Sequence, residues 1–246
     1  MDSQPSHWRH SLPSFLRQRI EVNTYLMHHL LAEAAKMLPA NAWVLDAGSG
    51  EGRFKPFFTH THYIGVDLAI GDATWDYSAL DAINTLEWLP FADNVFDAAV
   101  CTQVLEHLAE PEKVLREIQR VLKPGGILLL VAPQSWHEHQ IPHDYFRYTS
   151  YGLRYLLGKT GYQVETMKPL GGYFWYLSFQ LQQFTYWLFS RNHWLASTGL
   201  LRNLAKAGAA ILFEVILPLL LFPLDSLDQV QEATLGHFCV ARKNCA

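Results

Sequence analysis

A glycine-rich turn and two aspartates have the residue types and spacing that suit ligand binding. The turn is Gly-Ser-Gly-Glu-Gly at residues 48–52, directly after an apolar run that ends in Asp46, and Asp67 follows 21 residues after Asp46. Glycines permit a tight turn and let a ligand approach bare backbone, whose N–H groups favour a negatively charged group. An acid at the end of the next strand can accept both hydroxyls of a ribose. The pattern predicts a nucleotide-like ligand, although Asp67 alone could equally form an Asx turn or cap a helix.

The spacing of the glycines disfavours a dinucleotide. Dinucleotide sites have the pattern Gly-x-Gly-x-x-Gly, in which the third glycine packs a helix onto a strand around a pyrophosphate. In this chain the third glycine, Gly52, comes one position early. A nicotinamide-dependent oxidoreductase is therefore a weaker interpretation of the turn.

Histidines in the segment 134–149 are candidates for proton transfer. An imidazole titrates near neutral pH and can remove a proton from a reacting group. We consider His139 and His143 as the base. His107 could also face the substrate, or it could start a helix and bond only to backbone.

The same segment has two other interpretations. Asp144 and Arg147 could pair within a structural lid whose histidines are only solvated. His137, His139 and His143 could instead bind a metal ion, because a loop can bring such ligands together. We expect no bound metal.

Apolar runs and helical periodicity alternate along the chain, which predicts a doubly wound parallel sheet. Asp46, Asp67, Thr85 and Gln103 then lie at the carboxyl ends of strands, where ligands bind in such sheets. We expect helices at residues 15–38, from the glycine turn to about 59, 111–122 and 149–161, after a polar lead over 1–13. The expected strands are 42–45, 63–66, 85–88, 96–101, 127–132, 162–167 and 236–242.

Four motifs in this order resemble those of the class I S-adenosylmethionine (SAM)-dependent methyltransferases, in particular methyltransferase type 11. The first is Asp-Ala-Gly-Ser-Gly-Glu-Gly at 46–52, and the second is Leu-Pro-Phe-Ala-Asp-Asn-Val-Phe-Asp at 89–97. The others are Val-Leu-Glu-His at 104–107 and Arg-Val-Leu-Lys-Pro-Gly-Gly at 120–126. The resemblance implies a Rossmann-like, mostly parallel seven-stranded sheet, with SAM as the cofactor.

The resemblance also implies a role for individual residues. Gly48 and Gly50 would let backbone contact the methionine part of SAM, and Asp46 would lie near its ammonium group. Asp67 would bind the ribose. The remaining implied contacts are Leu68 packing on adenine, Thr85 and Leu86 at the adenine edge in place of the acid that the family often has, and Gln103 at the methionine end.

The composition of the chain limits the classes of binding partner and the cellular compartment that we expect. The chain has 246 residues, a net charge of −4 and a pI near 6.3, which disfavours a nucleic-acid partner. Its three cysteines lack metal-ligand spacing, and the odd number favours a reducing setting. We expect a cytoplasmic protein that could be peripheral to a membrane.

Residues 171–233 form an apolar, aromatic-rich insertion before the last strand. The stretch 207–224 is apolar except for Glu214, and it is long enough to form a transmembrane span. We disfavour a span, because one crossing would separate residues 236–242 from the sheet. The alternatives are a core layer or substrate lid, a homodimer interface, or shallow insertion into a membrane surface.

These observations predict a single domain over residues 1–246, with an N-terminal helix at about 14–38, a core at about 40–170 plus 235–243, and the insertion at about 171–233. The expected activity is in-line methyl transfer from SAM to a small-molecule or lipid-like acceptor, with a histidine base from 134–149. A non-catalytic partner or membrane-attached scaffold protein with the same fold is the alternative.

Overall fold

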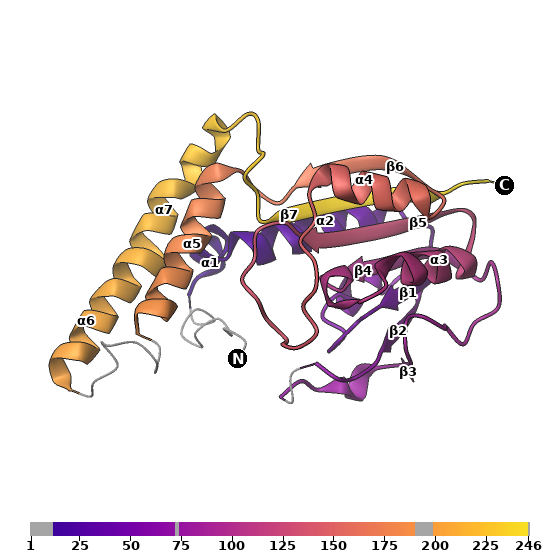
Figure 1. The fold of residues 1–246 in the computed structure, drawn as a ribbon, viewed down its shortest axis with the longest axis horizontal. Coiled ribbons are helices and arrows are strands. Elements are labelled where there is room, and N and C mark those ends of the chain that lie inside the picture. Colours follow the sequence, from indigo (N-terminus) through magenta and orange to yellow (C-terminus); the bar gives the residue numbers. More distant parts are fainter. Residues whose placement is uncertain (1–11, 72–73, 190–198, 246) are drawn as a thin grey trace. The chain divides into compact units, whose positions relative to one another are not determined.

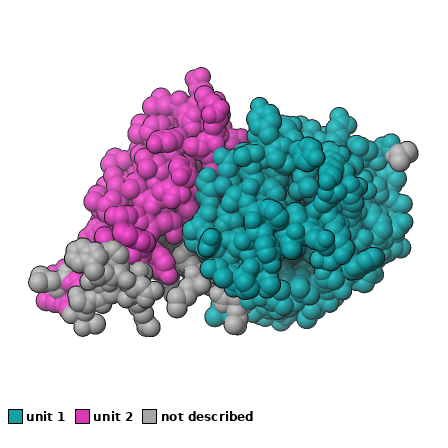
Figure 2. All heavy atoms as spheres, in the orientation of Figure 1, with its two compact units in different colours: residues 1–2, 27–168, 236–246 teal, residues 3–26, 169–235 magenta. Residues whose placement is uncertain are grey.

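The computed structural model describes residues 12–71, 74–189 and 199–245, so most of the polar lead predicted at 1–13 lies outside the described residues. The chain divides into two compact units (Figure 2). Unit 1 comprises residues 1–2, 27–168 and 236–246, and unit 2 comprises residues 3–26 and 169–235.

Unit 1 is built on a seven-stranded sheet with the strand order β3-β2-β1-β4-β5-β7-β6 (Figure 1). The pairs β1–β2, β1–β4, β2–β3 and β4–β5 are parallel, whereas β7 is antiparallel to β5. This arrangement confirms the predicted mostly parallel, Rossmann-like sheet. The strands are β1 (Trp43–Ala47), β2 (His62–Asp67), β3 (Ala82–Ile83), β4 (Phe96–Thr102), β5 (Leu122–Pro133), β6 (Tyr162–Pro169) and β7 (Gly236–Lys243).

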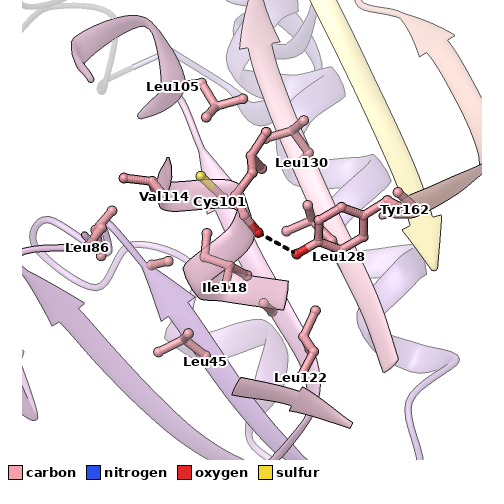
Figure 3. Close-up of a cluster of buried hydrophobic side chains, with 14 of the residues drawn as sticks. Leu45, Leu86, Cys101, Leu105, Val114, Ile118, Leu122, Leu128, Leu130 and Tyr162 are labelled. Atoms are coloured by element: carbon pink, nitrogen blue, oxygen red, sulfur yellow. Dashed lines mark hydrogen bonds between the residues drawn. The ribbon is translucent and has the colours of Figure 1, made fainter. Parts of the chain in front are cut away.

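Apolar residues fill both faces of the central strands, as parallel strands require. On one face, α3 (Pro111–Val121) and α4 (Ser150–Lys159) pack with β1, β4 and β5 in the cluster drawn in Figure 3. The Tyr162 hydroxyl lies within this cluster and donates to the Leu115 carbonyl oxygen at 3.1 Å. The helix α2 (Val22–Lys36), which belongs to unit 1 from Met27 onward, lies on the opposite face (Figure 1).

The sheet places a topological switch point beside β1. The chain runs outward from β1 through β2 to β3, and then returns to β4 on the other side of β1. Helical connections therefore leave β1 and β4 in opposite directions, which opens a crevice at their carboxyl ends. The residues that follow β1, β2 and β4 meet at this edge.

Three sequence-based expectations for unit 1 and its lead-in helix were wrong. The helix predicted after the glycine turn is only the short 3₁₀ helix η2 (Lys55–Phe58), because Gly52 has a φ of +71° and Pro56 lacks an N–H. The single N-terminal helix is divided at Glu21 into α1 (Ser14–Ile20) and α2.

The third strand, predicted at 85–88, is instead the two-residue β3. Side-chain hydrogen bonds close a turn over the predicted segment, since Asn84 donates to the Trp88 carbonyl oxygen and Thr85 accepts from the Glu87 N–H. Such local bonds compete with pairing in a sheet. The segment 74–83 contains the short η3 (Tyr77–Ala79) and β3, while residues 72–73 lie outside the described part.

Unit 2 is helical and its helix ends are tied together by aspartates. The Asp225 carboxylate accepts N–H bonds from Gly172 (2.9 Å) and Trp175 (3.0 Å), and Asp228 accepts one from Tyr173 (2.7 Å). These bonds cap the N-terminus of α5, where negative charge is favourable. The elements are α1, α5 (Tyr173–Leu188), α6 (Leu200–Ala210), the π-helical turn η5 (Ile211–Ile216), α7 (Leu217–Leu221) and the 3₁₀ helix η6 (Phe222–Leu227).

The last four of these elements continue into one another as a long apolar helix. The stretch Arg202–Leu227, with 26 residues, is long and apolar enough to cross a membrane, and only 6% of its most apolar window is buried. By contrast, Gln182 of α5 is buried and its side chain donates to the Ile20 carbonyl oxygen at 2.9 Å.

Candidate functional site

The glycine turn after β1 folds back on the end of β2. Gly48 and Gly50 have φ values of +85° and +53°, which residues with a side chain rarely adopt. The N–H groups of Gly48 and Ser49 donate to the Val66 carbonyl oxygen at 2.8 and 3.1 Å. These two N–H groups therefore hold the turn itself, which is a role that sequence reasoning did not foresee.

Asp67 joins the turn to the second strand. One of its carboxylate oxygens accepts the Gly50 N–H at 2.9 Å, and the other accepts the Ala69 N–H at 2.8 Å. Each oxygen keeps a further lone pair for a ligand hydroxyl. Leu68 beside it is 45% exposed, so its side chain is available for packing on a ligand.

Asp46 is a buried carboxylate at the end of β1. Its Oδ2 accepts a hydrogen bond from the Tyr63 hydroxyl, whereas its Oδ1 has no partner among the described residues. Burial raises the pKa of Asp46 to about 7, the Tyr63 bond opposes this shift, and the nearby Asp67 charge adds to it. Ser49 Oγ and Thr102 Oγ1 are also buried without a described partner. Unpaired buried polar atoms are rare in folded proteins, and here they gather at the ends of β1 and β4.

Trp75 is a contact of the turn that the sequence did not reveal. A side chain at Gly50 would come within 3.3 Å of the Trp75 ring, and one at Gly71 within 2.9 Å. Arg53 lies over the same ring, 5.7 Å from its centre. An aromatic residue in a loop has no distinguishing sequence pattern, so nothing in the sequence could have placed it here.

The predicted adenine-edge residues lie beside the main chain of Asp67, because the Asn84 N–H donates to the Asp67 carbonyl oxygen at 3.0 Å. The Leu86 side chain is buried in the core, and the Thr85 hydroxyl accepts the Glu87 N–H. Thr85 and Leu86 could therefore contact a ligand through their backbone N–H and C=O groups. Gln103 follows β4 with a φ of +54°, a strained value for a residue with a side chain.

The predicted histidines come together around the short helix η4 (Leu105–His107). His107 Nδ1 lies 2.6 Å from the His143 carbonyl oxygen, and the rings of His107 and His139 meet edge to face with centres 4.6 Å apart. Burial lowers the pKa of His107. The His143 ring is exposed, and its Nδ1 lies 3.1 Å from the Tyr145 hydroxyl.

Asp144 and Arg147 form the predicted ion pair inside this segment. Two guanidinium nitrogens of Arg147 donate to the two carboxylate oxygens at 2.6 and 2.7 Å. Burial raises the pKa of Asp144, but the Arg147 bonds and the His139 N–H outweigh it and lower the value to about 2. The pair holds residues 136–147 in one conformation, because Arg147 also donates to the carbonyl oxygens of Trp136 and His137.

Glu106 was not among the predicted site residues, although the Glu-His pair after β4 was visible in the motif at 104–107. Its side chain is fully buried, and neither carboxylate oxygen has a hydrogen-bond partner among the described residues. Burial raises its pKa to about 8. The Tyr145 and Phe146 N–H groups donate to its backbone carbonyl oxygen, which fixes the segment after β5 against η4.

A separate open hollow of about 750 Å³ lies beside α3 and is lined by Trp88, Lys113 and Arg116 among others. None of the predicted site residues lines it. The hollow is therefore separate from the predicted site residues at the ends of β1, β2 and β4.

Known proteins with similar sequences are methyltransferases. Residues 45–130 match the family described as "Methyltransferase domain". An uncharacterized methyltransferase of Mycolicibacterium gilvum is 34% identical over 116 residues, which span 42% of this chain and 46% of that protein. Residues 45–130 therefore have the sequence of a methyltransferase domain. The alignment spans less than half of that relative, so it bears on the methyltransferase domain and not on the whole protein.

Solved structures share the fold of this methyltransferase domain at low sequence identity. A putative methyltransferase from Bacillus halodurans C-125 has a TM-score of 0.52 at 17% identity, with 88% of this chain and 98% of that chain covered. The [4+2]-cyclase SpnF has a TM-score of 0.55 at 18% identity, with 90% and 82% covered. At such identities the similarity establishes the fold alone.

The residues present fit the cofactor that the methyltransferase family uses. SAM carries an ammonium group and a ribose, and the crevice offers the unpaired Asp46 oxygen for the former and Asp67 for the latter. The buried hydroxyls of Ser49 and Thr102 add two further unpaired polar atoms at this edge. A ligand with both donors and acceptors would satisfy them.

Proposed function

We propose that this protein transfers a methyl group from SAM to a small-molecule or lipid-like acceptor. The observation that carries the proposal is the unpaired, buried Asp46 carboxylate at the switch point, beside a glycine turn that is bonded to Asp67. When bound, SAM supplies an electrophilic methyl group on a sulfonium.

The residues of the chain contribute alignment and exclusion of water, which dominate an in-line displacement. Asp46 holds the ammonium group, Asp67 holds the ribose, and Leu68 packs on the adenine. Thr85 and Leu86 offer backbone groups to the adenine edge. Gln103, whose strained backbone orients it at the end of β4, lines the methionine end.

An acceptor with an O–H or N–H group needs a base, and His143 is the residue that we propose for this role. Its ring is exposed and can therefore return the proton to water, while its Nδ1 lies near the Tyr145 hydroxyl. His107 and His139 are less mobile, because both rings contact each other and backbone carbonyl oxygens.

The exposed apolar side chains of unit 2 favour an acceptor that lies at an apolar surface such as a membrane. The helix Arg202–Leu227 exposes most of its apolar side chains, which is unusual for a protein surface in water. We propose that this unit makes a peripheral contact with a membrane from the cytoplasmic side, and that a homodimer interface is the alternative.

The fold by itself does not decide the activity, since a [4+2]-cyclase shares it. A non-catalytic SAM-fold partner or scaffold is the second candidate. The two are separated by turnover, because a scaffold would bind SAM without transferring its methyl group to any acceptor.

Replacing Asp67 tests the proposed site. We expect Asp67→Ala to reduce SAM affinity at least 100-fold, because it loses charge-assisted bonds worth ~1.5–3 kcal/mol each. Calorimetric titration measures this loss, and far-ultraviolet circular dichroism confirms that the fold survives. Asp93→Ala is the matched control, since that exposed carboxylate pairs with Arg120 away from the turn. Undiminished SAM affinity in Asp67→Ala would refute the site.

A further inference from the structure

A second group of side chains lies three residues beyond Gln103, around η4 and the segment after β5. It combines one carboxylate and two imidazoles: Glu106, His107 and His139. One ligand atom from each residue lies within 4.8 Å of the others. The Glu106 Oε1 and His107 Nε2 atoms are 3.8 Å apart.

The free atoms of this group point to a missing ligand. Glu106 is fully buried with both oxygens unpaired, and His107 Nε2 is also buried without a partner among the described residues. A buried carboxylate without a hydrogen bond is costly and is normally paired or bound to a metal. When Glu106 is deprotonated, three electron-pair donors face one another, and a cation is a partner for all three at once.

The contacts of Nδ1 in His107 and His139 favour the tautomer in which Nε2 keeps its lone pair, as a metal ion requires. His107 Nδ1 lies 2.6 Å from a carbonyl oxygen, which only accepts, so Nδ1 carries the proton and Nε2 keeps its lone pair. His139 Nδ1 lies 3.2 Å from the His137 carbonyl oxygen and 3.4 Å from Asp144 Oδ2. Metal-binding histidines characteristically donate their second nitrogen to a carboxylate or a carbonyl in this way.

We propose that Glu106, His107 and His139 bind a divalent transition-metal ion. Two imidazoles and one carboxylate suit Zn²⁺ and its neighbours, whereas Mg²⁺ and Ca²⁺ prefer oxygen ligands throughout. Tetrahedral ligand atoms at ~2.1 Å from one ion lie ~3.4 Å apart, so the widest gap closes if each of the two atoms moves by less than ~1 Å. This set differs from the one considered from sequence, since it excludes His137 and His143.

Three protein ligands leave coordination positions open, as in catalytic sites. On the proposed function, an open position would take the hydroxyl oxygen of the acceptor and lower its pKa. His143 would take the proton of that hydroxyl as the O–C bond forms and the S–C bond of the sulfonium breaks, which would leave a neutral thioether. Binding of the ion itself does not depend on that function.

The test is direct titration of the full chain with Zn²⁺ after dialysis against a chelator. We expect one ion per chain by calorimetry and by elemental analysis. Glu106→Gln and His107→Gln should each weaken binding at least 100-fold, and Asp144→Asn, which removes a partner of His139, about tenfold. Co²⁺ in the site should show d–d absorption bands that the same variants lack.

His137→Gln is the matched control, because it removes a histidine of the same segment outside the group and should leave Zn²⁺ binding unchanged. The assignment is overturned if the full chain takes up no stoichiometric Zn²⁺, or if Glu106→Gln binds as tightly as the unaltered chain. SAM titration is a separate measurement, and Glu106→Gln should retain SAM affinity. Metal uptake without any SAM binding would uphold the ion site and refute the proposed function.

Discussion

Asp46 is the residue whose environment most needs a ligand to explain it. A carboxylate that is 1% exposed and only half satisfied destabilises the ligand-free protein unless it is neutral. Accordingly, its raised pKa of about 7 lies in the range where the group changes charge under ordinary conditions. An ammonium group beside it would restore the charged form, which couples ligand binding to pH.

We therefore expect SAM affinity to depend on pH through Asp46. Below pH 7 the carboxyl is neutral and must lose its proton on binding, so affinity should fall about tenfold per pH unit. Above pH 7 the affinity should level off. Calorimetry between pH 5.5 and 8.5 measures the profile.

The stability of the ligand-free protein should change in the opposite sense. The folded pKa of Asp46 exceeds the unfolded value, so the neutral carboxyl favours folding at low pH, and this contribution is lost as pH rises through about 7. SAM should then raise the melting temperature more at pH 8 than at pH 6. Asp46→Asn should bind SAM weakly at every pH, and a flat affinity profile in the unaltered chain would contradict the assignment.

At the scale of single residues, the sequence indicated candidate site residues but not their contacts. Asp46 and Asp67 were identified because an acid at a strand end has few structural explanations in combination with glycines. Glu106 was passed over because its motif does not say that the side chain is buried without a partner. Trp75 could not be found, since only the folded loop brings its ring to Gly50.

The glycine turn is the element on which the site depends, and its geometry is unusually strict at Gly48. A Cβ there would lie 2.4 Å from Val104, at a φ of +85°. We expect Gly48→Ala to destabilise the fold by about 2–4 kcal/mol, from left-handed strain and from overpacking. Urea denaturation measures the loss.

Two variants separate these contributions. Val104→Ala in the Gly48→Ala background should recover the part due to overpacking but leave the backbone strain. Gly158→Ala is the control, because nothing lies within 4 Å of its Cβ position in α4, and it should stabilise by ~0.5–1 kcal/mol. Equal stability of Gly48→Ala and the unaltered chain would show that the turn tolerates a side chain.

Elements with strong apolar periodicity were predicted closely, and elements set by local hydrogen bonds were not. The helix α3 begins at Pro111 and ends one residue before the predicted limit. The third strand was misplaced because the side chains of Asn84 and Thr85 close a turn over the segment that was predicted as a strand. Propensity cannot anticipate such bonds, since they depend on where the turn brings the acceptor.

For the whole molecule, the order of elements was sufficient to predict the sheet, because few topologies satisfy right-handed parallel crossovers. The environment of the insertion was not predictable. Sequence left open a core layer, and the structure instead leaves all but 6% of the most apolar window of the helix Arg202–Leu227 unburied. The predicted single domain over residues 1–246 stays a prediction, since two compact units can fold together or separately.

The exposed apolar side chains of the helix Arg202–Leu227 lead us to predict that the protein binds lipid vesicles. Leu204, Ile211 and Leu220 are 60%, 56% and 60% exposed, and they lie in three successive parts of this helix, α6, η5 and α7. The full chain should co-sediment with vesicles of phosphatidylcholine and phosphatidylglycerol. Replacing these three residues with Gln should weaken sedimentation more than tenfold, because burying each side chain in lipid contributes ~1.5–3 kcal/mol.

The control replaces Tyr151 and Tyr155 with Gln, since these side chains are even more exposed, at 83% and 72%, but belong to α4 of unit 1. That variant should sediment like the unaltered chain, and all variants should keep their SAM affinity, which depends on unit 1. Light scattering in the absence of vesicles tests the competing dimer. The apolar face is a protein interface, and the proposed membrane contact is wrong, if the full chain does not co-sediment with vesicles and is a dimer while the triple variant is a monomer.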